Sequence, residues 1–393
     1  MLKSRLTHVL IALGLIAAGC AENPVDSNRN SITAPPLASV ASDDDSEHDD
    51  YDGAAGMVFL MSNQTGGNEI LSFGRDEDGV LTASGAIATG GLGTGGGLGN
   101  QSSLILNEDR SRLYAVNAGS NDISVFRVNH GNLELMGSPV NSMGERPISL
   151  TIHEDLLYVL NAGGSGNIAG FRVKDDGTLM PIPGSIRPLG SDATGPAQVG
   201  FSPNGRTLVV TEKATNTVSS YSVGAEGTAQ GPVTIPSIGQ TPFGFAFNSA
   251  GFLVISEAAG GAPGVSSASS YRVGRNGPLH LISGAIPTTQ TAACWIAISE
   301  NGKYAFTTNA GSGTLSSLRI GHNGKLTLAN PVAGDAGPGS TPLDAAFSAG
   351  GRYLYVRLGM GTVGAFRFHE DGDLELIGKF GSLPAGANGL AAI

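Results

Sequence analysis

Residues 146–182, RPISLTIHEDLLYVLNAGGSGNIAGFRVKDDGTLMPI, contain the pattern from which most of this chain is built. An alternating apolar run opens the stretch at Ile148, Leu150 and Ile152, a polar turn follows, and LYVLN forms a second run. IAGFRV and, after an Asp-Asp-Gly turn, TLMPI complete a set of four. Period-two alternation closed by Gly, Asn or Asp is typical of half-buried strands joined by tight turns. The stretch therefore predicts one four-stranded antiparallel meander.

The same pattern recurs along the chain with a regular spacing. The aromatic or leucine residue of the third run falls at Phe73, Phe126, Phe171, Tyr221, Tyr271, Leu318 and Phe366. The steps between these positions are 53, 45, 50, 50, 47 and 48 residues. A period of about 40 to 50 residues is typical of a β-propeller, because one meander cannot bury both faces until it stacks between neighbours. The prediction is an all-β fold, a seven-bladed β-propeller of four-stranded antiparallel blades.

The two ends of the repeat region predict how the ring closes. The first unit begins at its second strand, residues 56–63 (GMVFLMSN), and lacks the opening run that the others carry. After the fourth strand of the last unit, the chain continues through residues 387–393, ANGLAAI, which read like the missing opening strand. We expect this C-terminal strand to pair in blade one and cover an otherwise open sheet edge.

Residues 1–19 have the pattern of an export signal. Two basic residues precede the apolar run Val9 to Ala18, which is too short to span a membrane. Ala-Ala-Gly directly before Cys20 resembles a bacterial lipoprotein signal, after which Cys20 is acylated and becomes the mature N-terminus. Ala21 resembles the outer-membrane sorting pattern of Gram-negative bacteria, in which case the protein faces the periplasm. The alternative is a plain signal peptide followed by a coincidental cysteine.

Residues 20–55 predict an acidic tether before the propeller, which we expect to span residues 56–393. The segment is poor in large apolar side chains and contains the run SDDDSEHDDYDG at 42–53, so it cannot bury enough surface to fold. The Asp cluster lacks the Gly-centred spacing of an ordered calcium loop, which favours a solvated spacer over a calcium site. A net charge of −11 argues against nucleic acid as a partner, and we expect a monomer.

The glycine-rich run GLGTGG at residues 91–96 satisfies the letters of a dinucleotide-binding motif. That motif needs a strand before it and a helix after it, so that phosphate meets the helix N-terminus. Here a strand follows instead, at residues 103–106. We therefore interpret the run as a loop between two blades and expect no cofactor.

Candidate functional residues fall where the second strand of each blade ends. Four repeats carry asparagine there, at Asn63, Asn117, Asn161 and Asn309. Blades four and five carry Glu212 and Glu257 instead. An asparagine at that point is most simply a turn residue, but a carboxylate in two adjacent blades needs another reason. The face of a propeller that carries these strand ends surrounds one mouth of the central channel, where we expect a ligand site.

The equivalent slots near the start of the first strand also face this mouth. They hold Ser103, Ser149, Gln198, Gly244, Trp295, Asp344 and Leu390, with Arg146 just upstream in blade three. Together with Lys213 and the two glutamates, the residues Arg146, Gln198, Trp295 and Asp344 predict a polar pocket with one aromatic wall. The alternative is that they are surface charges on mobile loops. None of the seven histidines falls in a mouth slot, so we expect neither a Ser-His-Asp triad nor a histidine-ligated metal.

Three motifs carry a resemblance to a known family. The segments RLYAVNAGSNDISVFRV, GPAQVGFSPNGRTLVVTEKATNTVSSY and GGRYLYVRLGMGTVGAFRF resemble the seven-bladed lactonases that include 6-phosphogluconolactonase and carboxymuconate cyclase. In that family, blade four typically reads Gly-Pro-Arg-His followed by a strand that ends in Asn-Glu. Gly195, Pro196 and Glu212 match this pattern. The departures are Ala197 and Gln198 for Arg and His in blade four, and Ser103 and Ser149 for the histidines usual in blades two and three.

Two hypotheses for the function follow. The first is an exported lactonase, a carboxylic ester hydrolase acting on a lactone or forming one from a sugar acid. Glu212 would be its base, Arg146 or Lys213 its oxyanion donor, and Gln198 would orient substrate or water. Lys213, Glu257, Trp295 and Asp344 would complete the substrate-binding set. The second is a non-catalytic propeller that binds an envelope glycan, peptide or protein and does not require the family's Arg and His.

Overall fold

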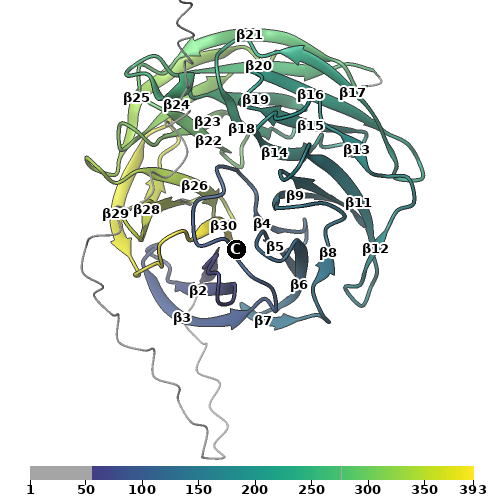
Figure 1. The fold of residues 1–393 in the computed structure, drawn as a ribbon. Coiled ribbons are helices and arrows are strands. Elements are labelled where there is room, and N and C mark those ends of the chain that lie inside the picture. The colour runs from purple at the N-terminus through teal and green to yellow at the C-terminus, as the bar shows by residue number, and fades with distance from the viewer. Residues whose placement is uncertain (1–54, 276) are drawn as a thin grey trace, which may run out of the picture.

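The computed structural model of the protein describes residues 55–275 and 277–393. It has seven antiparallel sheets that follow one another around a ring (Figure 1). The predicted seven-bladed propeller is therefore confirmed. The only helical element among the described residues is the short 3₁₀ turn η1 (Ala259–Gly261), and no described helix is long and apolar enough to cross a membrane. The signal peptide, Cys20 and nearly all of the tether predicted from the sequence lie outside the described residues.

The strands of the first four blades have the following bounds. Blade one holds β1 (Gly56–Met61), β2 (Glu69–Arg75) and β3 (Leu81–Ala88). Blade two holds β4 (Leu104–Leu106), β5 (Arg112–Asn117), β6 (Asp122–Asn129), β7 (Asn132–Leu135) and β8 (Val140–Asn141). Blade three holds β9 (Pro147–His153), β10 (Leu156–Asn161), β11 (Asn167–Val173), β12 (Leu179–Pro181) and β13 (Arg187–Pro188). Blade four holds β14 (Pro196–Phe201), β15 (Thr207–Glu212), β16 (Thr217–Val223) and β17 (Ala229–Pro236).

The remaining blades repeat the four-stranded order. Blade five holds β18 (Pro242–Phe247), β19 (Phe252–Glu257), β20 (Ser267–Val273) and β21 (Leu279–Pro287). Blade six holds β22 (Ala293–Ile298), β23 (Tyr304–Asn309), β24 (Thr314–Ile320) and β25 (Leu326–Asp335). Blade seven holds β26 (Pro342–Phe347), β27 (Tyr353–Leu358), β28 (Thr362–Phe368) and β29 (Leu374–Phe380). The last strand, β30 (Asn388–Ala392), belongs to blade one.

The core lies between neighbouring blades. All seven third-strand residues that mark the repeat are buried, with at most 4% of the side chain exposed. Phe306 of blade six packs against Phe347 and Phe368 of blade seven, with ring centroids 5.8 and 5.7 Å apart. Phe306 is buried, and burying a phenylalanine contributes roughly 1.5–3 kcal/mol relative to leaving it exposed. One blade alone would leave these faces in water, so each blade depends on its neighbours for stability.

Ring closure follows the sequence prediction. β30 pairs antiparallel with β1, and Val58 lies opposite Ala392 and Phe59 opposite Ala391. Met57 and Ile393 exchange two backbone hydrogen bonds, of 3.3 and 2.9 Å. β30 also contacts the inner strands β26 and β4 on either side. The C-terminus consequently lies inside the ring beside the first strands (Figure 1).

Blades two and three differ from the expected pattern in their fourth strands. In each, the outer strand is split into two short pieces, and β8 and β13 pair with the third strand beyond the break. Prolines stand at the breaks, Pro139 before β8 and Pro181 and Pro183 before β13. Proline cannot donate to a ladder, and it is confined to sheet edges and interruptions for that reason.

The closure predicts different costs for two glycine substitutions. Gly389 in β30 has a φ of +68°, and a Cβ there would lie 2.8 Å from both Leu104 Cβ and Ser103 Oγ. Gly350 has a φ of +78° and no neighbour within 4 Å of such a Cβ. Both alanine variants carry the left-handed strain of about 1–2 kcal/mol, but only Gly389→Ala adds a clash at the seam.

We expect Gly389→Ala to lose roughly 1–3 kcal/mol more than Gly350→Ala, measured by chemical or thermal unfolding. Deleting residues 388–393 should lower the melting temperature further still. Equal effects of the two glycine substitutions, or an unchanged melting temperature after the deletion, would contradict the closure.

Candidate functional site

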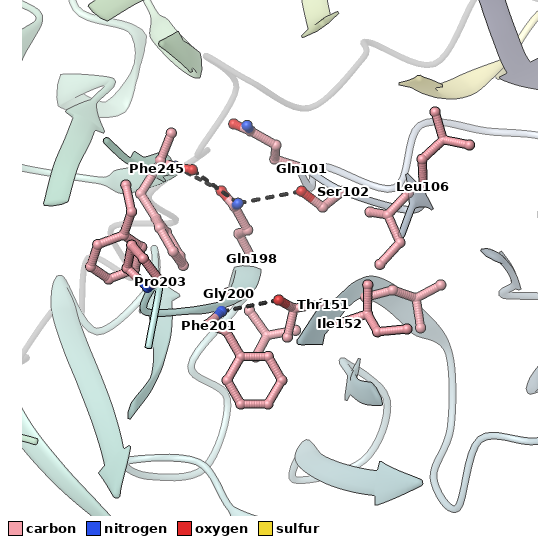
Figure 2. Close-up of a pocket in the computed structure, with 15 residues that line it drawn as sticks. Gln101, Ser102, Leu106, Thr151, Ile152, Gln198, Gly200, Phe201, Pro203 and Phe245 are labelled. Carbon is pink, nitrogen blue, oxygen red and sulfur yellow. Dashed lines mark hydrogen bonds between the residues drawn. The ribbon is translucent and has the colours of Figure 1, made fainter. Parts of the chain in front are cut away.

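The inner strands surround a central channel that contains a cavity of about 430 Å³. Its polar lining residues are Gln101, Ser102, Thr151 and Gln198. The side chain of Gln198 points toward Ser102 and Gln101, while Leu106 and Ile152 lie across the cavity from Phe245 (Figure 2). The cavity extends to Pro203 in the turn after β14, on the face opposite the predicted mouth.

A second cavity of about 380 Å³ adjoins the first. Gln101, Ser102, Ile105 and Leu106 line both of them. The second cavity adds the carboxyl group of Asp344 and extends to Asn107, Glu108 and Arg110, in the turn between β4 and β5. Ser102 therefore stands between an uncharged compartment and one that contains a carboxylate.

The predicted mouth is occupied by the chain itself. Residues 89–103, which we name the plug loop, connect β3 to β4 and run into the middle of the ring (Figure 1). This loop includes the glycine-rich run at 91–96, and the strand β4 follows it as the sequence predicts. Backbone hydrogen bonds join Gln101 N–H to the Ala197 carbonyl at 3.1 Å and Leu150 N–H to the Ser102 carbonyl at 2.8 Å.

Gln101 attaches the plug loop to blade six. Its amide donates to the Ile296 carbonyl at 2.8 Å and accepts from the Ile296 N–H at 3.0 Å. The space for this side chain exists because residue 244 of blade five is glycine. A Cβ at Gly244 would lie 2.0 Å from Gln101 Oε1. The missing side chain of one blade is thus replaced by a residue from the plug loop.

Gln101 is one of a series of side chains that link neighbouring inner strands. Three others lie on the inner strands, and each of them accepts a hydrogen bond from a backbone N–H of the next blade: Val199 N–H donates to Ser149 Oγ at 3.1 Å, Phe245 N–H to Gln198 Oε1 at 2.7 Å, and Gly389 N–H to Asp344 Oδ2 at 3.2 Å. We call these contacts inter-blade staples. An inner strand is the edge of its sheet, so its inward N–H groups need such acceptors when they are buried. Gln198 also donates to the Phe245 carbonyl at 3.0 Å and to Ser102 Oγ at 3.3 Å.

Glu212 and Glu257 point into their own blades. Glu212 is fully buried and accepts hydrogen bonds from Gly190 N–H at 3.1 Å, Ser219 Oγ at 2.7 Å and Thr217 Oγ1 at 3.0 Å. Glu257 likewise accepts from Gly239 N–H at 2.9 Å and from two serines of β20. Burial raises the pKa of Glu257, while the hydrogen bonds from Ser267, Ser269 and Gly239 oppose the shift.

The asparagines at the equivalent positions explain what the glutamates do. Asn117 and Asn309 donate to serines seven residues further on, Ser124 and Ser316, at 2.8 and 2.9 Å. Glu212 binds Ser219 at the same spacing, but with the donor and acceptor reversed. A carboxylate can accept the backbone N–H of the incoming loop as well. This geometry favours an anchoring role for both glutamates, and their predicted catalytic and binding roles stay predictions.

Lys213, Trp295 and Arg146 lie at the plugged mouth. Lys213 Nζ donates to the Gly99 carbonyl of the plug loop and, at 3.2 Å, to the Pro196 carbonyl, and it lies 4.8 Å from the centre of the Phe243 ring. Burial, with a smaller contribution from Arg146, lowers the pKa of Lys213 to about 7. Trp295 is buried with its ring 4.7 Å from that of Phe243, whereas Arg146 is exposed.

The structure thus divides the predicted site residues into three groups. Gln198 and Asp344 line the channel cavities, Lys213, Trp295 and Arg146 lie around the plug, and the two glutamates lie within blades. Gln101, Ser102 and Thr151 were missed by sequence reasoning. Two features of the sequence could have pointed to them. The first step between repeats, 53 residues, is the longest of the series, and Gly244 occupies a slot in which the other blades have a side chain.

No group of three or more His, Cys, Asp or Glu side chains suited to a metal ion occurs between residues 55 and 393, with residue 276 set aside.

Comparison with known proteins gives the following matches. The profile of the family described as "Lactonase, 7-bladed beta-propeller" matches residues 62–182 and 257–387. A search of proteins of curated function found no match. Among solved structures, a putative 6-phosphogluconolactonase from Bacteroides fragilis is 20% identical with a TM-score of 0.67, covering 86% of this chain and 98% of that one. The periplasmic gluconolactonase PpgL of Pseudomonas aeruginosa is 19% identical with a TM-score of 0.66, and a Lactobacillus plantarum protein is 17% identical with a TM-score of 0.69; each match covers 86% of this chain and 99% of the other.

The staple made by Gln101 predicts a specific loss of stability. Gln101→Ala would leave the N–H and C=O groups of Ile296 without partners, which costs roughly 1–3 kcal/mol per buried group. The matched control is Gln240→Ala, which removes an exposed glutamine. We expect urea unfolding to show a clear decrease for Gln101→Ala and a change within about 0.5 kcal/mol for the control. Equal values would contradict the staple.

The lowered pKa of Lys213 predicts a pH dependence of stability. The folded protein binds this proton less readily than the unfolded chain does, so the stability that Lys213 contributes rises as pH increases from about 7 toward 10.5. As pH is raised from 6.5 to 9.5, we expect the melting temperature of wild type to increase relative to that of Lys213→Met. The exposed Lys303→Met is the control and should parallel wild type. Parallel curves for Lys213→Met as well would show that the lysine titrates normally.

Proposed function

Because the chain belongs to the lactonase family of seven-bladed β-propellers, we propose that it binds and hydrolyses a lactone in the central channel below the plug loop. The observation that carries the proposal is the position of Ser102. It lines both channel cavities, so a ligand ester group beside it lies between the uncharged compartment and the one that contains Asp344. Family membership alone fixes no reaction, because one fold supports many functions.

Ring opening needs a base for water and a donor for the oxygen that becomes negative. Asp344 is the carboxylate at the inner end of the second cavity, and it is positioned by the N–H of Gly389. Ser102 receives a hydrogen bond from Gln198, so its own hydroxyl hydrogen is directed elsewhere and can donate to a carbonyl oxygen. Gln101 uses one amide hydrogen on Ile296 and has a second for the same purpose. The alternative base is Glu212, as the resemblance to the family implies.

We further propose that the mature protein is exported and held at a membrane by a lipid on Cys20, with the acidic segment as a flexible tether. The export pattern of residues 1–19 supports this location. The structurally similar Pseudomonas aeruginosa protein is a periplasmic gluconolactonase, which supports both a lactone ligand and a place outside the cytoplasm.

A non-catalytic binding propeller is the second candidate. Two observations favour it. The plug loop occupies the mouth at which the catalytic site was expected, and the amide group of Gln198 is already hydrogen-bonded to Phe245 and Ser102. Such a protein would bind a ligand without turning it over, and turnover therefore separates the two candidates.

The two carboxylates predict opposite results on substitution. Asp344→Asn retains an oxygen for Gly389, and we expect a loss of lactone hydrolysis of at least about 100-fold in protein that its melting temperature shows to be folded. Glu212→Gln can accept from Gly190 and Ser219 and donate to Thr217, so we expect near-normal activity. Glu212→Ala should instead lower stability.

The assay is a pH-stat measurement on a panel of lactones, with melting temperatures recorded in parallel. Activity lost in Glu212→Gln but retained in Asp344→Asn would move the base to Glu212. Ligand binding without turnover by wild type would favour the binding propeller.

A further inference from the structure

The larger channel cavity is uncharged. Apart from its four polar residues, the lining consists of apolar side chains and one glycine: Ile105, Leu106, Leu150, Ile152, Val199, Gly200, Phe201, Pro203, Phe245, Ala246 and Phe247. No acidic or basic side chain is among them. An anionic ligand, such as a phosphorylated sugar lactone, would lose its hydration here without meeting a cation, which is strongly unfavourable.

The polar and apolar parts of this cavity lie at different depths. Gln101 and Ser102 of the plug loop form its inner end together with Gln198 (Figure 2). Leu106, Phe201 and Phe247 are the last residues of β4, β14 and β18, at the opposite end of the inner strands. Leu106, Ile152 and Phe247 keep part of their surface in solvent, although they line the channel. An apolar wall therefore leads from the opening to a polar inner end.

The inner end offers hydrogen-bond donors. Ser102 already accepts from Gln198 at 3.3 Å, so it has a hydroxyl hydrogen left to donate. Thr151 lies further toward the opening, where its Oγ1 accepts from Phe201 N–H at 3.0 Å. Gln101 retains one amide hydrogen, as described above. An ester group carries acceptors only and suits these donors, whereas the hydroxyl groups of a sugar need acceptors as well.

We propose that the substrate is a neutral lactone with an alkyl or aryl substituent rather than a sugar lactone. Its ester group binds at Ser102, and its substituent extends along Ile152 and Phe247 toward the opening on the face opposite the plug loop. The inference rests on the proposed lactone function and specifies the substrate class of the same site. Because the substituent leaves water for an apolar wall, each added methylene should tighten binding about threefold to fourfold until the wall ends.

The test is a series of γ-lactones from γ-valerolactone to γ-decalactone, with glucono-δ-lactone for comparison. Binding is measured by calorimetry and hydrolysis by pH-stat, both on the propeller as purified. We expect affinity and kcat/KM to rise along the series and the gluconolactone to be the weakest ligand. Ile152→Ser should make this rise less steep, because the loss of affinity should be larger for longer alkyl chains. The melting temperature of the variant shows whether it is folded.

The matched control is Leu376→Ser, which removes an exposed leucine of the outer strand β29 and should leave the series unchanged. Hydrolysis of gluconolactone with no gain along the alkyl series would overturn the substrate class while leaving the lactonase proposal standing. If no lactone is bound or hydrolysed, both proposals fail. A rise along the series that Ile152→Ser leaves intact would place the substituent elsewhere and overturn the proposed position.

Discussion

The innermost strand of every blade is a sheet edge that faces the channel, and its backbone N–H groups must find acceptors outside their own sheet. At three junctions a side chain of the preceding blade supplies the acceptor, from Ser149 to Val199, from Gln198 to Phe245 and from Asp344 to Gly389. Apolar packing between the blades holds the ring together, but these hydrogen bonds fix the register of one inner strand against the next. The polar residues around the channel are consequently structural first, and any chemistry uses what hydrogen-bonding capacity remains.

One gap in this series determines where a ligand can lie. Blade five has Gly244 where the other blades have a side chain, and Gln101 of the plug loop fills the space and binds Ile296. Because Gln101 takes this position, residues 89–103 lie in the channel and occupy its mouth. The free volume is left below the plug loop, with Ser102 at its inner end and apolar walls toward the opposite face. The position of the ligand site thus follows from the hydrogen bond that the backbone N–H of Ile296 donates to Gln101.

The fold was predictable because its signals are local and repeated. Period-two strands and turn residues recur in seven units that are 45–53 residues apart, and the incomplete first unit identifies the closing strand. The candidate site was predictable only in part. Gln198 and Asp344 occupy the expected slots, but the slot of Glu212 does not reveal that its carboxylate turns toward Ser219 and Gly190. Gln101 was out of reach because it acts in a blade 195 residues away, through a contact that depends on a missing side chain.

The most direct test of the inter-blade staples is native-state hydrogen exchange at the inner-strand amides of Phe245 and Ile296. These N–H groups lie at a sheet edge, where that of Phe245 donates to Gln198 and that of Ile296 donates to Gln101. We expect slow exchange of both amides in the wild-type protein and selective loss of protection at Ile296 in Gln101→Ala. Fast exchange of both in wild type, or protection at Ile296 that survives the substitution, would contradict this expectation.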